Sequence, residues 1–107
     1  MSNRWGIPKS LEDKVRERDK YCVYCRVKLA SNNKGGSRKN LPTWEHIIND
    51  AGIITPENIA LCCASCNSSK GTKLLSDWIN SDYCKRKGIN SKKVAPVVKK
   101  ALKRDKY

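Results

Sequence analysis

Four cysteines stand in two pairs that have the spacing of a metal-binding site. Cys22 and Cys25 form one C-x-x-C pair, and Cys63 and Cys66 form a second. Structural zinc takes four thiolates in a tetrahedron, and a two-residue spacing lets one turn present both sulfurs to the same ion. The sequence therefore predicts one structural Zn²⁺ per chain. A redox-active C-x-x-C and small buried thiols are the alternatives for the same residues.

Two further cysteines are surplus to this set. Cys62 directly precedes Cys63, so in an extended backbone its side chain points the other way. We expect Cys62 and Cys84 to be small buried hydrophobic residues, with an exchange of Cys62 into the zinc set as the alternative. The two pairs are separated by 37 residues. Because a compact zinc ribbon has only about 15 to 20 residues there, we expect a structured insertion between the pairs.

The insertion contains the only histidine of the chain, His46, in the run "TWEHI" directly after Glu45. A neutral imidazole with a pKa of about 6.5 suits a general base at neutral pH. A hard divalent ion such as Mg²⁺ prefers oxygen ligands, for which a carboxylate and an amide suffice. The alternative for a lone histidine on an apolar strand is a buried core residue. Adjacent strand residues point to opposite faces, so Glu45 and His46 serve one site only with a twist or bulge, or by approaching the substrate from different sides.

Charge is unevenly distributed along this basic chain. The sequence has 23 lysines and arginines against 10 acidic residues, which gives a net charge of +13. Residues 45–57 contain three acidic residues and no basic one, whereas residues 85–106 contain ten basic residues and one acid. The overall balance indicates a polyanionic partner. The acidic segment is either exposed loop charge or part of a divalent-metal site.

Local patterns predict the elements that must position these residues. A helix is expected over "SLEDKVRERDK", residues 10–20, with Ser10 as its N-cap, and the turn "YCVYC" follows it. Residues 41–48 are the best strand candidate, because bulky and β-branched residues gather there. Residues 57–62 are a second candidate, in which apolar residues alternate only loosely.

Three helical segments are expected after the second strand. "ASCNSSKG", residues 64–71, is a short helix with a glycine cap, and residues 75–88 repeat the pattern of helix, basic last turn and glycine. Asn90 or Ser91 is the expected cap of a final helix, although Pro96 falls late for its first turn. Apolar residues of this tail recur at roughly helical spacing, so one face can pack on the domain while the other stays basic.

Length and composition exclude several classes of protein. At 107 residues, we expect one domain whose small core needs additional stabilisation, for example by a structural metal ion. No apolar run is long enough to cross a bilayer, so no membrane partner is expected. The start "MSNRWGIPKS" lacks the apolar region of a secretory signal. We therefore expect a cytoplasmic protein that is not secreted, with cysteines reduced or metal-bound.

The order and spacing of these residues together resemble the HNH nuclease family. The resemblance covers about residues 8–80 and is carried by Cys22, Cys25, Glu45, His46, Asn58, Cys63, Cys66, Asn67, Lys70 and Gly71. It implies an α+β fold: a small zinc-stapled ββα-metal domain with flanking helices, in which two strands and a helix hold one divalent ion. Residues 1–107 would form this single domain, with 81–107 as a basic helical C-terminal extension.

By this resemblance the chain is a metal-dependent endonuclease that nicks or cleaves DNA in a bacterial or phage-infected cell. His46 is then the general base, Glu45 and Asn67 hold a catalytic Mg²⁺ or Mn²⁺, and Asn58 braces the hairpin loop so that His46 faces the phosphate. The family usually has Asp where this chain has Glu45, and "INDAG" replaces the Pro-Gly that often follows the histidine. A non-catalytic zinc-stapled nucleic-acid-binding module and a nuclease that acts on RNA are the alternatives.

Double-stranded DNA is the expected partner, and two basic segments are expected to contact its phosphates. The candidate residues are Lys34, Arg38, Lys39, Lys92, Lys93, Lys99, Lys100, Lys103 and Arg104. For the tail, the alternative is a solvated face of a terminal helix. Arg4, Arg26 and Arg38 are candidates for base contacts, which the sequence does not distinguish. Because a double-strand cut needs two active sites or two visits, a homodimer is compatible with this activity.

Overall fold

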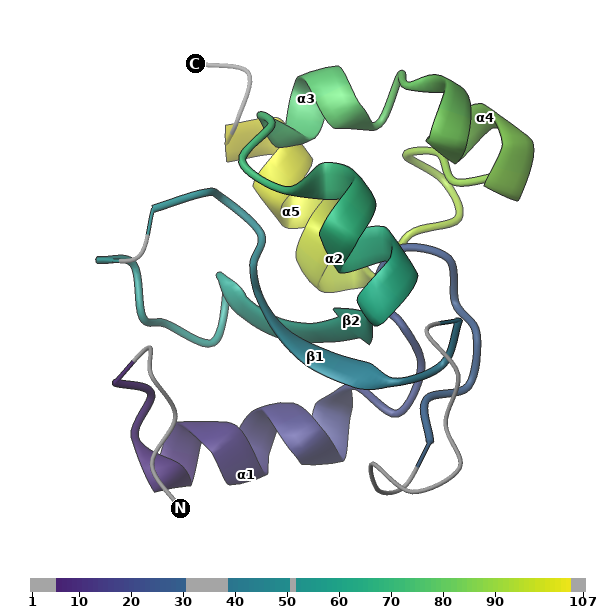
Figure 1. Cartoon of the computed structure of the whole chain (residues 1–107). Helices are drawn as coiled ribbons and strands as arrows, with labels where there is room; N and C mark the ends of the chain where they lie inside the picture. Colours follow the sequence, from purple (N-terminus) through teal and green to yellow (C-terminus); the bar gives the residue numbers. More distant parts are fainter. Residues whose placement is uncertain (1–5, 31–38, 51, 105–107) are drawn as a thin grey trace.

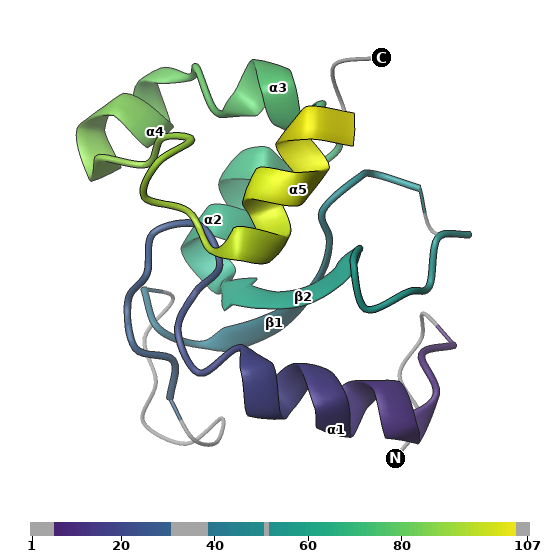
Figure 2. The same ribbon diagram turned by 180° about the vertical axis from the view of Figure 1, so that it is seen from behind.

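The computed structural model describes residues 6–30, 39–50 and 52–104. In this part the chain is an α+β protein with one two-stranded antiparallel sheet and five helices. The elements are α1 (Lys9–Arg18), β1 (Pro42–His46), β2 (Ile59–Cys63), α2 (Ala64–Lys70), α3 (Leu75–Trp78), α4 (Asp82–Lys87) and α5 (Pro96–Arg104). Figure 1 shows α1 on one side of the sheet and α2 on the other, with α5 behind α2, and Figure 2 shows the opposite side, where α5 lies in front of α2.

The two strands form the hairpin that the sequence predicts. Their antiparallel register pairs Trp44 with Leu61 and His46 with Ile59. Both strands lie within one or two residues of the expected segments 41–48 and 57–62. All five residues of β2 are buried, because α1 and α2 cover its two faces.

The helix α2 begins directly where β2 ends. Cys63 is its N-cap, and the Cys63 sulfur accepts a hydrogen bond from the backbone N–H of Cys66. Gly71 ends the helix at a positive φ of 50°, and its N–H donates to the carbonyl of Asn67. The expected helix over 64–71 with a glycine cap is therefore confirmed.

The expected N-cap of α1 is wrong. The helix begins at Lys9, and Pro8 rather than Ser10 occupies the N-cap position. The ring of Pro8 holds φ at −61° with an extended ψ of 147°, and its carbonyl accepts the N–H groups of Leu11 and Glu12. A proline thus starts this helix because it loses no donor there.

Residues 75–88 form two short helices instead of the single helix expected. Ser81 stays extended, with φ −73° and ψ 162°, and its hydroxyl accepts the N–H of Cys84 at 3.3 Å. Ser81 is therefore the N-cap of a separate helix, α4, because serine at the N-cap position stabilises a helix N-terminus. The C-terminal cap is as expected: Gly88 is left-handed with φ 73°.

The last helix begins at Pro96, so neither Asn90 nor Ser91 caps it. The side-chain oxygen of Asn90 instead accepts the N–H groups of Lys92 and Lys93 and closes a separate turn. Proline is favourable at a first helical position because the N–H that it lacks has no partner there.

The apolar residues of the C-terminal segment 94–102 belong to the hydrophobic core. The expected packing of this face on the domain is therefore confirmed. Val94, Ala95, Val98, Ala101 and Leu102 are all buried. The N–H of Ala95 also donates to the carbonyl of Val23, in the first cysteine loop. None of the helices in the described ranges is long and apolar enough to cross a membrane.

Candidate metal centre and cleft

The four cysteines of the two C-x-x-C pairs lie together. The sulfurs of Cys22, Cys25, Cys63 and Cys66 all lie within 4.8 Å of one another, and those of Cys25 and Cys63 are 3.8 Å apart. Tetrahedral zinc with Zn–S bonds of about 2.3 Å separates its sulfurs by about 3.8 Å. The cluster is therefore placed to bind one metal ion, consistent with structural zinc.

The hairpin and the first loop bring the two pairs together. Cys22 and Cys25 lie in a tight turn in which the N–H of Arg26 donates to the carbonyl of Cys22 at 3.0 Å. Arg26 has a positive φ of 68°. Hydrogen bonds among the four sulfurs lower the pKa of Cys25 and Cys63 and raise the pKa of Cys22 and Cys66.

Cys62 and Cys84 are not part of the cluster. Both are fully buried, and burial raises the pKa of each thiol. They are small buried residues, as expected. The acidic residues of the segment 45–57 form no second group: within the described residues, the four cysteines are the only set of three or more His, Cys, Asp or Glu side chains placed to hold an ion.

The hydroxyl of Tyr83 contacts the cysteine cluster from α4. It donates a hydrogen bond to the sulfur of Cys66 at 3.4 Å. The Tyr83 ring stacks on Trp78, with ring centroids 6.0 Å apart. Burial and the hydrogen bond to Cys66 raise the pKa of Tyr83, so the hydroxyl keeps its proton and remains a donor. Such a donor stabilises the negative charge of a ligating thiolate.

We expect Tyr83→Phe to weaken zinc binding by about tenfold, because outer hydrogen bonds of metal ligands typically contribute that much. The measurement is competition for zinc with a coloured chelator. Tyr21→Phe is the control, because the exposed Tyr21 ring contacts Arg26 rather than a sulfur. Equal zinc affinities for Tyr83→Phe and the wild type would contradict a role for this hydroxyl.

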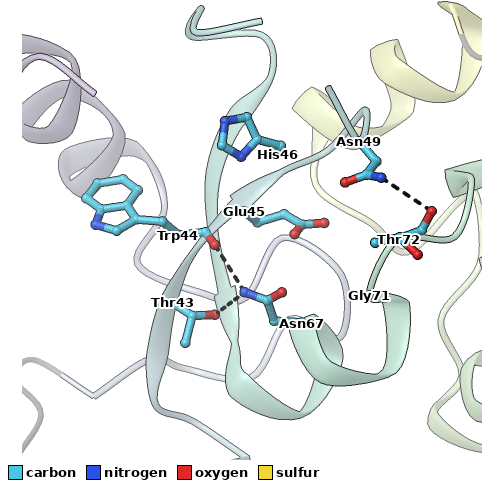
Figure 3. Close-up of a pocket in the computed structure, with 8 residues that line it drawn as sticks. All are labelled: Thr43, Trp44, Glu45, His46, Asn49, Asn67, Gly71 and Thr72. Carbon is cyan, nitrogen blue, oxygen red and sulfur yellow. Dashed lines mark hydrogen bonds between the residues drawn. The ribbon is translucent and has the colours of Figure 1, made fainter. Parts of the chain in front are cut away.

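A polar cleft of about 480 Å³ lies beside β1. It is lined by Thr43, Trp44, Glu45, His46, Asn49, Asn67, Gly71 and Thr72 (Figure 3). The sequence predicted three of these as site residues, and the fold places Glu45, His46 and Asn67 around this one cleft. Across the cleft, the Asn49 amide donates to the carbonyl of Thr72 at 3.4 Å.

Asn58 holds the loop that follows His46. Its side-chain oxygen accepts the N–H of Ile48 at 2.7 Å. Its amide donates to the carbonyls of Ile48 and Ile53 at 3.2 and 3.1 Å. Asn58 is fully buried, so these bonds keep the end of β1 and the hairpin loop in one conformation.

Asn67 is oriented by β1. Its amide nitrogen donates to the hydroxyl of Thr43 and to the carbonyl of Trp44, each at 3.0 Å. These bonds fix which way the amide faces, and Figure 3 shows the oxygen turned away from them toward the side of Glu45. The amide oxygen is therefore presented to the cleft.

His46 is the last residue of β1 and is 8% exposed. Burial lowers its pKa, the positive charge of Lys70 lowers it further, and Asp50 opposes this shift. The imidazole is therefore neutral at pH 7. Trp44 and His46 point to one side of β1 and Glu45 to the other (Figure 3). Glu45 and His46 nevertheless both line the same cleft.

Glu45 is held in place by two partners that the sequence pattern did not identify. Its Oε2 atom accepts a hydrogen bond from the Tyr24 hydroxyl at 2.5 Å and lies 3.1 Å from the ammonium of Lys70. All three residues are buried. Burial raises the pKa of Glu45, while Lys70 and Tyr24 lower it. Both contacts use Oε2, so Oε1 is the atom that can face a ligand.

The predicted basic residues lie elsewhere. Within the described ranges, none of the candidate phosphate contacts lines the cleft. The exposed ones are Lys39, Lys92, Lys93, Lys99, Lys100 and Lys103. Lys99 and Lys103 line a second hollow of about 470 Å³ between α3 and α5. Lys34, Arg38, Arg4 and the side chain of Arg104 lie outside the described residues.

Fold and site together define a small α+β protein in which four cysteines are placed to bind one metal ion beside a polar cleft. No family model, curated protein or solved structure matches the chain.

Proposed function

We propose that this protein is a metal-dependent DNA endonuclease of the HNH type, which hydrolyses phosphodiester bonds by nicking or by double-strand cleavage. The observation that carries the proposal is the single cleft lined by Glu45, His46 and Asn67. These residues are a candidate base and two candidate oxygen ligands. They come from a hairpin and helix fastened by the cysteine cluster, in the order in which the family has them. The net charge of +13 supports a polyanionic substrate.

His46 is the general base of the proposed reaction. It takes a proton from the water molecule that attacks the phosphorus atom, which only the neutral imidazole can do. Burial and Lys70 lower its pKa, so the competent form is present at neutral pH. Asn58 keeps the loop after His46 fixed through its three hydrogen bonds, which limits the orientations open to the imidazole.

Oε1 of Glu45 and the amide oxygen of Asn67 are the atoms that would hold a catalytic Mg²⁺ or Mn²⁺, since hard divalent ions prefer such oxygens. The ion would stabilise negative charge on the departing oxygen. The ammonium of Lys70, 3.1 Å from Oε2, offsets part of the carboxylate charge. We therefore expect weaker binding of the divalent ion than at an unpaired carboxylate.

One observation favours a second candidate function. The buried contacts of Glu45 with Lys70 and Tyr24 also suit a purely structural carboxylate. In that case the protein is a non-catalytic, zinc-stapled module that binds nucleic acid. A nuclease that acts on RNA uses the same chemistry and differs only in its substrate.

Digestion of supercoiled plasmid tests the proposal. The zinc-loaded protein is incubated with plasmid and either Mg²⁺, Mn²⁺ or no added divalent ion, which avoids a chelator that could also remove the zinc. We expect nicked or linear plasmid only with the added ion, and ends that carry 5′-phosphate and 3′-hydroxyl. Binding without cleavage would favour the non-catalytic module. A parallel assay with a structured RNA identifies an RNA nuclease by faster cleavage of that substrate.

Basic residues of α5 are expected to contribute to DNA affinity through phosphates. Deleting the tail is unsuitable as a test because Val94, Val98 and Ala101 belong to the core. Changing the exposed Lys99, Lys100 and Lys103 to Gln should weaken binding and reduce the slope of log affinity against log salt by about 0.9 per lost contact. The measurement is fluorescence anisotropy with a labelled duplex and no added divalent ion.

The matched control for these lysines keeps the charge. Changing the same three lysines to Arg should preserve both the affinity and the salt slope. If the Gln variant also preserves both, this face of α5 does not contact DNA and its charge is solvated.

A further inference from the structure

Arg16 lies against the outer side of the cleft. It is an exposed residue in the last turn of α1, and its guanidinium carbon lies 5.0 Å from the ring centroid of Trp44. Trp44 is half-buried and lines the cleft. A guanidinium over an indole ring at this distance is held by a cation–π interaction. Arg16 therefore presents a positive charge at a defined place beside the cleft.

This charge lies on the side of the sheet to which His46 points. Side chains alternate along a strand, so Trp44 and His46 share a face, as Figure 3 shows. Helix α1, which contains Arg16, covers that same face. Two strand residues span about 6.6 Å. Trp44, the residue that Arg16 contacts, is therefore separated from the candidate base His46 by this distance along the strand.

The neighbouring arginine in the same helix turn has a different role. Arg18 donates hydrogen bonds to both carboxylate oxygens of Asp19 and to the carbonyls of Pro56 and Ile59. These bonds join α1 to β2 and to the hairpin loop. For Arg16, the ring of Trp44 is the contact found within the described residues. Its N–H groups therefore remain available for an anion, which a guanidinium binds through two parallel hydrogen bonds.

We propose that Arg16, held on the ring of Trp44, binds the DNA backbone phosphate adjacent to the phosphate that is cleaved. This inference rests on the proposed nuclease function for the position of the cut, but not for the phosphate contact itself. By binding one phosphate, the guanidinium sets the position of the DNA strand along the cleft, so that the adjacent phosphate, which is cleaved, lies at His46. Arg16 is a substrate-binding residue, separate from the lysines of α5.

Affinity for a labelled DNA duplex without added divalent ion tests the contact directly. Arg16→Gln should raise Kd by about tenfold or more, since it removes a charge-assisted pair of hydrogen bonds. Arg16→Lys should recover only part of the affinity, because lysine lacks the planar fork. Lys14→Gln is the control: it removes one exposed charge from the far side of the same helix and should change Kd by less than about twofold. Equal losses of DNA affinity in Arg16→Gln and Lys14→Gln, or no loss in either variant, would overturn the proposed contact.

A second arm tests which phosphate is bound. Once the cut position is mapped, one neutral methylphosphonate is placed at the phosphate next to it. This change should weaken binding of the wild type and have little further effect on Arg16→Gln, because both remove the same interaction. If the methylphosphonate and Arg16→Gln lower the DNA affinity by amounts that simply add, Arg16 does not bind this phosphate and the proposed register is wrong. If the wild type does not cleave DNA, the nuclease proposal fails, while the affinity arm still decides the phosphate contact. Circular dichroism confirms that the variants are folded.

Discussion

Replacing His46 with alanine should lower the rate of DNA cleavage by about 10² to 10⁴, the usual contribution of a general base. Zinc content and DNA affinity should stay near those of the wild type, because the cysteine cluster is the expected zinc site and exposed basic residues are the expected DNA contacts. The measurement is single-turnover cleavage at saturating protein, with affinity measured separately in the absence of divalent ions.

His46→Gln is the matched variant for this experiment. It keeps a polar side chain of similar length at a position that is only 8% exposed, but it provides no base near neutral pH. We expect it to fold as the wild type does and to cleave as slowly as His46→Ala. Wild-type cleavage by either variant, or loss of the fold in both, would assign His46 to the core.

The dependence of cleavage on pH follows from the environment of the same imidazole. Burial and Lys70 lower its pKa, so the neutral form persists to a lower pH than for an exposed histidine. The rate should rise with pH and reach half of its maximum below the usual histidine pKa of about 6.5. A profile measured with wild type and with His46→Gln separates this titration from pH effects on metal or DNA binding.

Removing the metal should unfold the protein. Structural zinc contributes about 10–16 kcal/mol of apparent binding free energy in small zinc-dependent domains, against a net stability of about 5–15 kcal/mol for a typical domain. Here the cluster joins the first loop to the start of α2, and the first loop also holds α5 through the bond between Val23 and Ala95. Chelation and Cys25→Ser should therefore both abolish the tertiary near-ultraviolet circular dichroism signal.

Cys84→Ala is the control for this prediction. Cys84 is as fully buried as Cys22 but lies outside the cluster, so the change should cost only about 1 kcal/mol and leave zinc binding intact. Elemental analysis should find one zinc ion per chain in the wild type and in Cys84→Ala. A protein that contains no zinc, or that keeps its fold after chelation, would contradict a structural metal centre.

Much of the architecture was predictable because its signals are local. The spacing of the C-x-x-C pairs indicated the metal cluster, and the bulky run around Trp44 together with the apolar segment before Cys63 indicated the hairpin. Gly71 and Gly88 indicated helix ends, since each takes a positive φ that other residues rarely adopt. Local signals failed at Ser10, Ser81 and Asn90, because each of these residues can cap several neighbouring turns and the sequence alone does not select one.

The surroundings of the candidate site were decided by tertiary structure. Glu45 meets Tyr24 and Lys70, and Arg16 meets Trp44, across more than twenty residues of sequence in each case. No periodicity or spacing encodes such contacts; they arise when α1 and α2 pack on opposite faces of the hairpin. The sequence alone therefore determined which side chains are available for chemistry. Packing of the helices on the sheet decided which of these side chains face one another, and so which charges are neutralised and which remain for a ligand.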